Sequence, residues 1–410
     1  MPGGQTIHLY CLCWNDARML PYFFRHYDRI VDKYFVFDNG STDASLSMLE
    51  NHERVEITPF EVPGDSFVEE ERRLGDTIWR HSNADWVIIT DIDEHIYHPY
   101  LIDYLRRCKE RNITAIQSIG YEMVSDTFPS AAEPLTELVV MGVRSGGHDR
   151  LCIFNPKAVT ATNFGPGRHK AKPEGRIVWP EYPEALLLHY KQLGKQYLVA
   201  RSAELRRGLR SRDLQSSWGV HYTWSAAKIA ANWRKMKKAS GPVPGLGTLK
   251  HMEPAKYFEE ERILRQSGLV DQEWYLVAYP DVESAGADPV VHFCVHGWKE
   301  GRRPNFYFDP EWYCANYPEL HTDGRNPLYE YVVAGERKSA WPSPLFNTGW
   351  YRVEHGLSEG ESPLRHYLRR RLKGLVSPLP EFDVVGYCQS HPEILTAGDD
   401  PFENYCKQNQ

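Results

Sequence analysis

Short apolar runs alternate with amphipathic stretches through the first third of the chain. The runs in IHLYCLCW, KYFVFDN and DWVIIT are rich in aromatic and β-branched residues and have the length of buried strands. MLPYFFRHYDRI and SLSMLEN have the spacing of helices and follow the first and the second of these runs. This order is typical of a mostly parallel sheet with helices on its faces, so we expect an α/β domain over residues 1–240.

Polar residues end three of the expected strands, as Asn15-Asp16, Asp38-Asn39-Gly40-Ser41 and Asp91-Ile92-Asp93-Glu94. Ligands of such sheets bind beyond the carboxyl ends of the strands, which makes these residues candidates for a site. Asp91 and Asp93 share one face of a strand and can reach one hard divalent cation, which could neutralise a diphosphate. Helix capping or a solvated turn is the alternative for this pair.

The turn DNGSTD at 38–43 can hold a nucleoside through its base and ribose hydroxyls. The alternative is an Asx or Ser/Thr helix cap, for which STDAS is a good sequence. Asp38 could serve one role while Ser41 serves the other.

Beyond the Gly/Pro-rich stretch GPVPGLG at 241–247 the chain repeats itself. Four repeats begin at Asp271, Asp309, Asn347 and Asp383, at intervals of 38, 38 and 36 residues. Each opens with a residue suited to cap a helix, and each has a Pro suited to the first turn of a later helix. We therefore expect a linker over 241–267 and an all-α domain over 268–410. Two short helices per repeat would stack into a small solenoid whose last repeat is a cap.

Charge is segregated along the chain. The 410 residues carry 48 Lys and Arg and 55 Asp and Glu, a net charge of −7, which excludes a general attraction for nucleic acid. Ten Lys and Arg but only two acids fall within residues 201–238, a net charge of +8, so the remainder sums to −15. This basic segment could approach an anionic inner leaflet, or it could form helices on the sheet with a solvated charged face.

Targeting and redox signals favour a cytoplasmic protein. No apolar run approaches the roughly 20 residues that span a bilayer, and the N-terminus lacks the basic and apolar regions of a signal peptide. Eight Cys without a C-x-x-C pattern fit neither a disulfide scaffold nor a zinc ribbon. We expect free thiols and a cytoplasmic location, with peripheral contact at the inner membrane face as the alternative given by 201–238.

Three segments carry a family resemblance. CLCWNDARMLPYF, FVFDNGSTDAS and DWVIITDIDEH resemble the GT-A, family 2-like glycosyltransferases, in the bacterial branch whose D-x-D motif reads D-x-D-E. The resemblance continues through GYEMVSDTFP, GPGRHKAKPEG and LLLHYKQLGKQYLVAR and covers about 200 residues in the family's order, although Glu94-His95 departs from the family's Glu-Phe. It implies a GT-A, Rossmann-like fold and metal-dependent, inverting transfer of a sugar from a nucleotide-sugar donor to a glycan or lipid-linked saccharide acceptor.

The resemblance also implies roles for individual residues. Asn15, Asp16 and Asp38 would border the nucleoside, Asp91 would lie near ribose and metal, and Asp93 would hold Mn²⁺ or Mg²⁺. His189 is the first choice for a late histidine at the metal or diphosphate, and His169 is the second. Candidates to bind the leaving diphosphate are Arg72, Arg73, Arg150 and Lys191. Candidates for the base that takes the acceptor's proton are Asp149 and Glu122, with Asp126 behind them.

The repeats resemble those appended to bacterial glycosyltransferases of surface-polysaccharide assembly, most closely in FDPEWYCANYPEL and HFCVHGWKEGRRP. Exposed Trp and Tyr would suit stacking on an acceptor glycan, whereas buried aromatics would form the core of the repeats. Oligomerisation through the repeats is a third reading.

Two other function classes remain open. A nucleotidyltransferase or sugar-phosphate enzyme would also use paired carboxylates and a metal, but it would usually carry a Gly-rich, basic phosphate loop after the first strand. A non-catalytic carbohydrate-binding protein is disfavoured because Asp91, Asp93 and His189 are intact.

Overall fold

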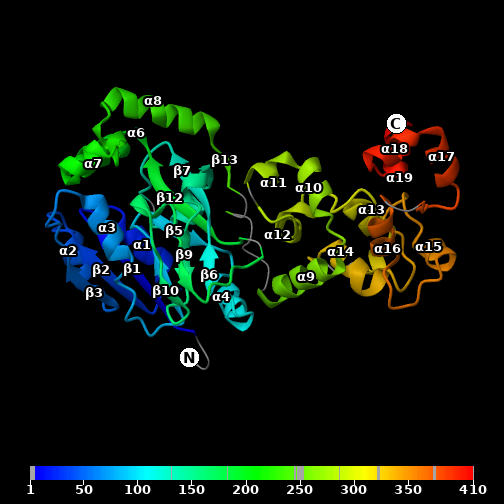
Figure 1. The fold of residues 1–410 in the computed structure, drawn as a ribbon, viewed down its shortest axis with the longest axis horizontal. Coiled ribbons are helices and arrows are strands. Elements are labelled where there is room, and N and C mark those ends of the chain that lie inside the picture. Colours follow the sequence, from blue (N-terminus) through cyan, green and yellow to red (C-terminus); the bar gives the residue numbers. More distant parts are fainter. Residues whose placement is uncertain are drawn as a thin grey trace. The chain divides into compact units, whose positions relative to one another are not determined.

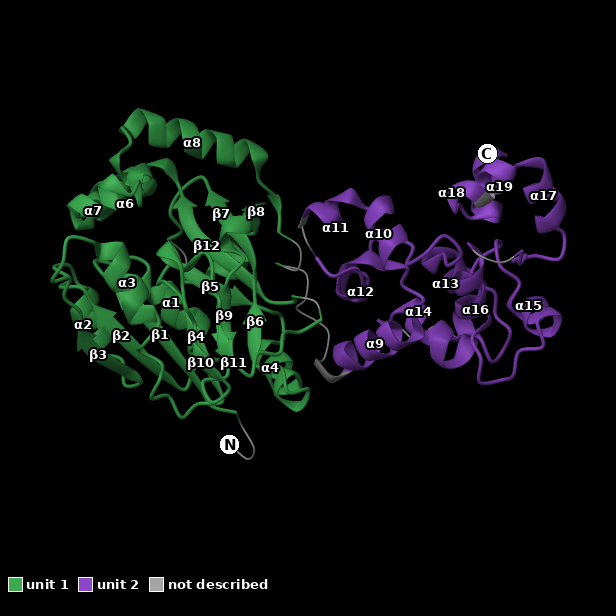
Figure 2. Ribbon diagram, viewed as in Figure 1, with its two compact units in different colours: residues 1–249 green, residues 250–410 purple. Residues whose placement is uncertain are grey.

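The computed structural model describes residues 5–130, 132–181, 183–243, 246, 254–285, 287–320, 324–372 and 375–409. The chain divides into two compact units, residues 1–249 and 250–410, here called the N-terminal and C-terminal units (Figure 2). The first is α/β, with a mostly parallel sheet flanked by helices, and the second is helical (Figure 1). No helix of the described residues is both long enough and apolar enough to cross a membrane.

A six-stranded sheet in the order β3-β2-β1-β4-β9-β6 forms the core of the N-terminal unit. Its strands are β1 (Ile7–Cys13), β2 (Lys33–Asp38), β3 (Val55–Pro59), β4 (Trp86–Ile89), β6 (Ala115–Gln117) and β9 (Leu151–Phe154). β1 to β4 are mutually parallel, whereas β9 is antiparallel to both β4 and β6. Helices α1 (Leu20–Tyr27), α2 (Ser45–Glu50) and α3 (Phe67–Gly75) connect the parallel strands.

The strand order reverses between β1 and β4, because the chain moves outward to β3 and then returns to the other side of β1. Such a switch point opens a crevice beyond the carboxyl ends of the two strands. β4 is buried along its whole length, and α1 packs its Leu20, Phe23 and Tyr27 side chains into the core. These apolar faces fix the sheet and so fix where its polar strand ends lie.

A second sheet of five strands has the order β13-β8-β7-β12-β5. Its strands are β5 (Glu94–Tyr97), β7 (Ile119–Ser125), β8 (Met141–Arg144), β12 (Leu186–Leu193) and β13 (Gly241–Pro242). Asp91 and Asp93 lie in the short connection between β4 of the first sheet and β5 of the second. β12 runs antiparallel to β5 and parallel to β7, with His189 opposite Glu94 on one side and opposite Glu122 on the other.

Shorter elements complete the N-terminal unit. The helices are α4 (Leu101–Glu110), α5 (Leu135–Leu138), α6 (Lys195–Gly208), α7 (Ser211–Gln215) and α8 (Ala226–Ala239), and a small sheet pairs β10 (Val159–Ala161) with β11 (Glu174–Gly175). Single 3-10 turns are η1 (Gly146–His148), η2 (Pro166–Arg168) and η3 (Val220–Thr223).

The predicted linker over 241–267 is corrected at both ends. Gly241 and Pro242 form β13, and α9 spans Pro254–Ser267, whereas residues 244–245 and 247–253 lie outside the described residues. The first two repeats contain α10 (Gln272–Ala278), α11 (Pro280–Ala285), α12 (Pro289–His292), η4 (Phe293–Gly297), α13 (Pro310–Asn316), η5 (Pro318–Leu320), α14 (Pro327–Glu330) and η6 (Tyr331–Gly335). The last two contain α15 (Thr348–Glu354), α16 (Pro363–Arg370), α17 (Val384–Ser390), α18 (Pro392–Ala397) and α19 (Pro401–Gln408). The first and last repeats thus exceed the two helices expected of them.

Each repeat opens with a capped helix. The side chains of Asp271, Asp309, Asn347 and Asp383 accept hydrogen bonds of 2.9–3.1 Å from the backbone N–H three residues later. Four later helices with Pro at their first position, α12, α14, α16 and α19, have a capping side chain as well, from Asp288, Asn326, Ser362 and Asp400. α18, which begins at Pro392, has none. Tyr275, Tyr313 and Tyr351 are fully buried, and the Trp before each of them is partly buried. These aromatic pairs are therefore core residues of the repeats.

The repeats do not form an open solenoid. Arg371 belongs to the third repeat, and its guanidinium lies 2.6 Å from Asp271 Oδ2 of the first repeat and 2.9 Å from Asp400 Oδ2 of the last. One side chain thus connects the first and last repeats. Trp274 Nε1 of the first repeat also donates to Glu403 Oε1 of the last at 3.2 Å. In a solenoid each repeat contacts only its neighbours, so the solenoid prediction is wrong and the four repeats close on themselves.

Candidate active site

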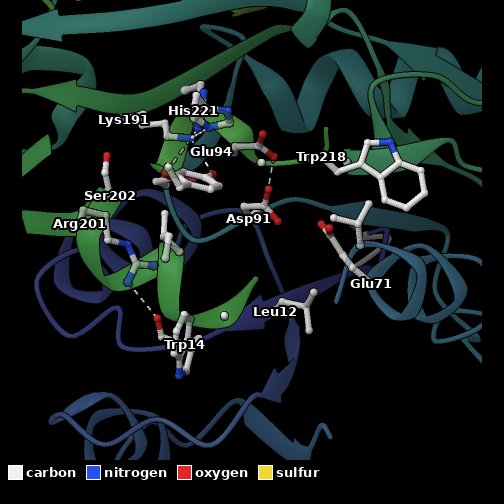
Figure 3. Close-up of a pocket in the computed structure, with 18 of the residues that line it drawn as sticks. Leu12, Trp14, Glu71, Asp91, Glu94, Lys191, Arg201, Ser202, Trp218 and His221 are labelled. Carbon is white, nitrogen blue, oxygen red and sulfur yellow. Dashed lines mark hydrogen bonds and ion pairs between the residues drawn. The ribbon is translucent and has the colours of Figure 1, made fainter. Parts of the chain in front are cut away.

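A cavity of about 660 Å³ lies at the strand ends of the N-terminal unit (Figure 3). The end of β1 contributes Trp14 and Asp16, and the loop after β2 contributes Asn39. The β4–β5 connection contributes Asp91, Asp93 and Glu94, and β7 and β12 contribute Glu122, His189 and Lys191. The opposite wall comes from α6 and the segment that follows it, through Arg201, Ser202, Trp218, His221 and Tyr222.

His189 is the centre of a row of ionisable groups set by strand register. Its Nδ1 atom lies 2.9 Å from Glu122 Oε1, and its Nε2 atom lies 3.4 Å from Asp93 Oδ2. Burial lowers the pKa of His189, but the Glu122 and Asp93 carboxylates outweigh burial and hold it well above the ordinary value. Burial likewise raises the pKa of both acids, but the facing His189 leaves the pKa of Asp93 depressed and that of Glu122 at about 2.

His148 joins this group from η1. Its Nε2 atom lies 3.5 Å from Glu122 Oε1, and its ring centre lies 4.5 Å from that of His189. Burial and the neighbouring His189 lower the pKa of His148 to about 3, so its imidazole is neutral. Candidate ligand atoms of Glu94, His148 and His189 all lie within 4.8 Å of one another. His148, and not the predicted His169, therefore falls within this group.

His169 lies on the outer side of the His148 ring, farther from His189. It is exposed, its Nδ1 is 2.7 Å from the Gly147 carbonyl oxygen, and its ring packs at 87° to that of His148, with centres 5.5 Å apart. The geometry supports His169 as a wall of the cavity, because it lines the same space.

The residues present fit a divalent metal. Asp93 offers a carboxylate oxygen and His189 an imidazole nitrogen, and these two atoms face each other across 3.4 Å. In the ionised pair the Nε2–H of His189 faces Asp93. On loss of that proton, with Nδ1–H still donated to Glu122, Nε2 would present a lone pair to the Asp93 side. A carboxylate that fixes the tautomer and orientation of a histidine in this way is a common outer partner of metal ligands.

Asp91 has a different environment from Asp93. Its Oδ1 atom accepts a charge-assisted hydrogen bond from Arg168 Nη2, and its backbone N–H donates to Glu94 Oε2 at 3.0 Å. Arg168 is 4% exposed and has a φ of +54°, so its backbone adopts the left-handed region to place a buried guanidinium behind Asp91. The expected place of Asp91 near ribose and metal stays a prediction, and one of its two oxygens is bound to Arg168.

The Asp16 carboxylate lies at the other end of the cavity and is held by Arg201. Arg201 Nη2 lies 2.5 Å from Asp16 Oδ1. Arg201 Nη1 donates to the carbonyl oxygen of Trp14 (Figure 3) and to that of Asn15. Burial raises the pKa of Asp16 to about 6, even though Arg201 and the Trp14 N–H favour the charged form. Arg201 thus joins α6 to the end of β1.

Asn15 and Asp38 build loops at this end and are absent from the cavity wall. The Asn15 Oδ1 atom accepts from Thr42 N at 2.7 Å, and Asp38 Oδ2 accepts from Ser41 N at 3.0 Å. Of the residues expected to border a nucleoside, only Asp16 lines the cavity, joined there by Asn39. Asp38 thus closes the DNGSTD turn but does not cap α2, whose N-cap is Ala44, and its place beside a nucleoside stays a prediction.

Of the four basic residues expected to bind the leaving diphosphate, two line the cavity and two do not. Lys191 and Arg150 line the cavity, with Lys191 Nζ donating to Tyr222 OH at 2.8 Å and Arg150 Nη2 lying 2.6 Å from Glu94 Oε1. Arg72 and Arg73 are exposed on α3, and Arg73 pairs with Glu70 at 2.8 Å. The prediction of a diphosphate-binding role for Arg72 and Arg73 is corrected, because neither lines the cavity.

The three candidate bases are all engaged elsewhere. Asp149 accepts from Gly120 N at 2.8 Å and pairs with Arg144 at 2.6 Å, which ties η1 to β7 and β8. Asp126 is exposed and paired with Lys237. Of the three, only Glu122 lines the cavity, and its carboxylate is bound to His189. The pKa of Glu122 is about 2, far below that of a base suited to neutral pH. Asp149 is thus corrected to a structural residue.

No protein-family model and no curated protein sequence matches the chain. Among solved structures, glucosyl-3-phosphoglycerate synthase from Mycobacterium tuberculosis, in complex with Mn²⁺, UDP-glucose and phosphoglyceric acid, matches with 19% identity and a TM-score of 0.21. That match covers 28% of this chain and 44% of the other. Mannosyl-3-phosphoglycerate synthase from Rubrobacter xylanophilus matches with 14% identity and a TM-score of 0.22, over 28% and 40%. S. aureus TarS 1–349 in complex with UDP matches with 9% identity and a TM-score of 0.27, over 72% and 92%.

The chain thus spans less than half the length of the first two of these proteins. Because the TM-scores are low, these likenesses carry no weight for the chemistry of this chain.

Proposed function

We propose that this protein is a metal-dependent glycosyltransferase that moves a sugar from a nucleotide-sugar donor to a saccharide acceptor. The observation that carries this proposal is the facing pair of Asp93 and His189, which lies in one cavity with Lys191 and Arg150 and with the ends of β1 and β2. The resemblance of the strand-end motifs to family 2-like enzymes supports the same activity and an inverting, single displacement.

Residues in three parts of the cavity would each bind a different part of the donor. Asp16 and Asn39 would border the nucleoside, because they lie at the ends of the two strands beside the switch point. Lys191 and Arg150 would face the diphosphate, since they supply the positive charge of the inner wall. Asp93 and His189 would hold Mn²⁺ or Mg²⁺, and Glu94 and His148 have candidate ligand atoms close to those of His189.

The bound ion would supply Lewis-acid stabilisation of the departing nucleoside diphosphate. Lys191 is suited to share that work, because its ammonium stays charged: burial lowers its pKa, but Tyr222, Asp93 and Glu122 more than compensate and raise it. Trp218, His221 and Tyr222 form a wall on the other side of the cavity, where an aromatic face could stack on an acceptor sugar. We propose a glycan or lipid-linked saccharide of surface-polysaccharide synthesis as the acceptor, in line with the resemblance of the repeats.

Hydrolysis of nucleotide sugars in the absence of acceptor tests the proposal. The native protein and Asp93→Ala are incubated with UDP-, GDP-, dTDP- and CMP-sugars, with Mn²⁺ and with a chelator. We expect turnover of at least one donor that needs the metal and that falls by roughly 10²-fold or more in the variant. Asp126→Ala, an exposed acid outside the cavity, is the matched control. Metal-independent turnover, or equal turnover by Asp93→Ala, would remove the transferase assignment.

A further inference from the structure

One surface of the N-terminal unit is strongly basic. The α6–α8 layer, defined as residues 201–238, shows seven exposed cations for which the described residues offer no ion pair: Arg206, Arg207, Arg210, Lys228, Arg234, Lys235 and Lys238. Other cations of the layer are neutralised, as Arg201 is by Asp16 and Arg212 by Glu69. Residues 1–200 carry 21 Lys and Arg against 28 Asp and Glu. An anionic surface would therefore attract this layer and repel the rest of the unit.

The inner side of the same layer forms one wall of the cavity. Ser202 and Leu205 of α6 line it, and so do Tyr222 of η3 and Ile229 of α8. Figure 2 shows α6, α7 and α8 together along one edge of the N-terminal unit. The elements that enclose the candidate site thus also carry the seven exposed cations, none of which lines the cavity.

Two large apolar side chains are exposed within the layer. Leu214 at the end of α7 is 47% exposed, and Val220 at the start of η3 is 44% exposed. Leu214 lies within four residues of Arg210 in the sequence, so cation and apolar group belong to one local surface. A soluble polyanion offers nothing for these apolar groups, whereas the boundary between lipid headgroups and acyl chains accepts them.

We infer that the α6–α8 layer docks on an anionic lipid bilayer and holds the candidate site beside the headgroups. The inference rests on the proposed function, because a lipid-linked saccharide would then reach the cavity from the surface on which the layer lies. Attraction between Lys or Arg and anionic lipid falls off within a Debye length, so the contact is reversible and weakens with salt.

Sedimentation with lipid vesicles tests the inference on the full chain. Vesicles of phosphatidylglycerol mixed with phosphatidylcholine are compared with phosphatidylcholine alone, at low and high salt. We expect binding to the anionic vesicles only, reduced by salt and weakened about tenfold or more when Arg206, Arg207, Arg234 and Lys235 are all changed to Glu. The matched control reverses four exposed cations elsewhere in the unit, Arg80, Arg111, Lys170 and Arg176, and should bind like the native protein.

A second variant separates a bilayer from a soluble polyanion. Leu214→Ser with Val220→Ser should weaken vesicle binding and leave binding to dextran sulfate unchanged. Equal binding to neutral vesicles, native-like vesicle binding by the four-site Glu variant, or vesicle binding unaffected by the Ser changes would each overturn the inference. The last result, together with dextran sulfate binding, would assign the layer to a polyanionic polymer instead.

Donor hydrolysis distinguishes failure of this inference from failure of the proposed function. The four-site Glu variant should hydrolyse the donor in solution at the native rate, which also reports that it is folded. Asp93→Ala should lose hydrolysis and keep native vesicle binding. Loss of hydrolysis in the Glu variant would show that the layer acts on the cavity itself and would overturn a separate docking role.

Discussion

His189 and Glu122 lie side by side on parallel strands, and the Nδ1 atom of His189 lies 2.9 Å from Glu122 Oε1. The opposite ring nitrogen, Nε2, is 3.4 Å from Asp93 Oδ2. The strand pairing that builds the second sheet thus also sets the direction in which a candidate metal ligand points. Glu122 acts in this arrangement as a positioning residue, and the chemistry falls to the groups on the other side of the ring.

Glu122→Ala should weaken metal binding. Without its acceptor, the Nδ1–H of His189 no longer fixes the ring or its tautomer, and we expect the affinity for Mn²⁺ to fall by roughly 10–100-fold. Calorimetric titration of Mn²⁺ into the protein in the presence of a nucleoside diphosphate measures it. Glu122→Gln retains an acceptor oxygen and should lose less. Native affinity in the Ala variant would show that Glu122 has no part in orienting His189.

Gly120→Ala should displace His148 from the site. A Cβ atom at Gly120 would lie 2.3 Å from His148 Cβ and 2.5 Å from its carbonyl carbon, so η1 must move away from β7. We expect a loss of about 1–3 kcal/mol in the free energy of unfolding, with weaker Mn²⁺ binding. Gly146→Ala is the control, since the nearest atom, Asp149 Oδ2, is 3.9 Å away. Urea unfolding of both variants measures the difference, and equal costs would contradict the packing argument.

Arg201→Met should destabilise the N-terminal unit. The Arg201 and Asp16 side chains are only 14% and 11% exposed, and removing the cation leaves a buried carboxylate unpaired. Breaking such a pair costs about 3 kcal/mol or more, whereas the exposed pair of Arg73 and Glu70 should contribute about 1 kcal/mol or less. A double-mutant cycle with Asp16→Asn, followed by urea unfolding, gives the coupling energy. Additive effects of the two changes would show that the pair does not act as a unit.

Glu336 should make the stability of the C-terminal unit depend on pH. Burial raises the pKa of Glu336 to about 7 from an ordinary 4.5, although Ser362 Oγ donates to its carboxylate at 2.5 Å. The folded state therefore binds a proton that the unfolded state releases between these two values. This contribution is complete below 4.5 and is lost as the pH rises through 7, by at most about 1.4 kcal/mol per pH unit.

Glu336→Gln removes this dependence. Because buried His292, with a pKa of about 3, acts in the opposite direction, the useful quantity is the difference between the native and variant proteins. We expect the Gln variant's advantage in thermal stability to shrink as the pH is lowered from neutral toward 4.5. A difference in thermal stability between the two proteins that stays constant across that pH range would show that the Glu336 carboxyl does not titrate within it.

The strand ends could be predicted from sequence because a buried parallel strand has a continuous apolar run with an abrupt polar end. β4 and the acids that follow it are an example, since all four strand residues are buried. His189 could be found for the same reason, because it lies within the long apolar strand β12.

Other residues of the site reach it from segments without a periodic pattern. Arg201 meets Asp16 across 185 residues of sequence and Arg168 meets Asp91 across 77, so no local signal connects either pair. His148 follows two glycines in η1 and has no apolar periodicity around it. Helix phase explains the error at Arg72: Glu71 lines the cavity, and the next residue on α3 points about 100° away from it, into solvent.

The ion pair between Arg371 and Asp271 fixes the number of repeats in the C-terminal unit. Inserting or deleting one repeat would move Arg371 out of reach of its partners and leave the buried Asp400 carboxylate uncompensated. Open arrays lengthen by duplication and fray from their ends. A closed set of four has no free end, so it should melt in a single step and tolerate change by substitution but not by gain or loss of a copy.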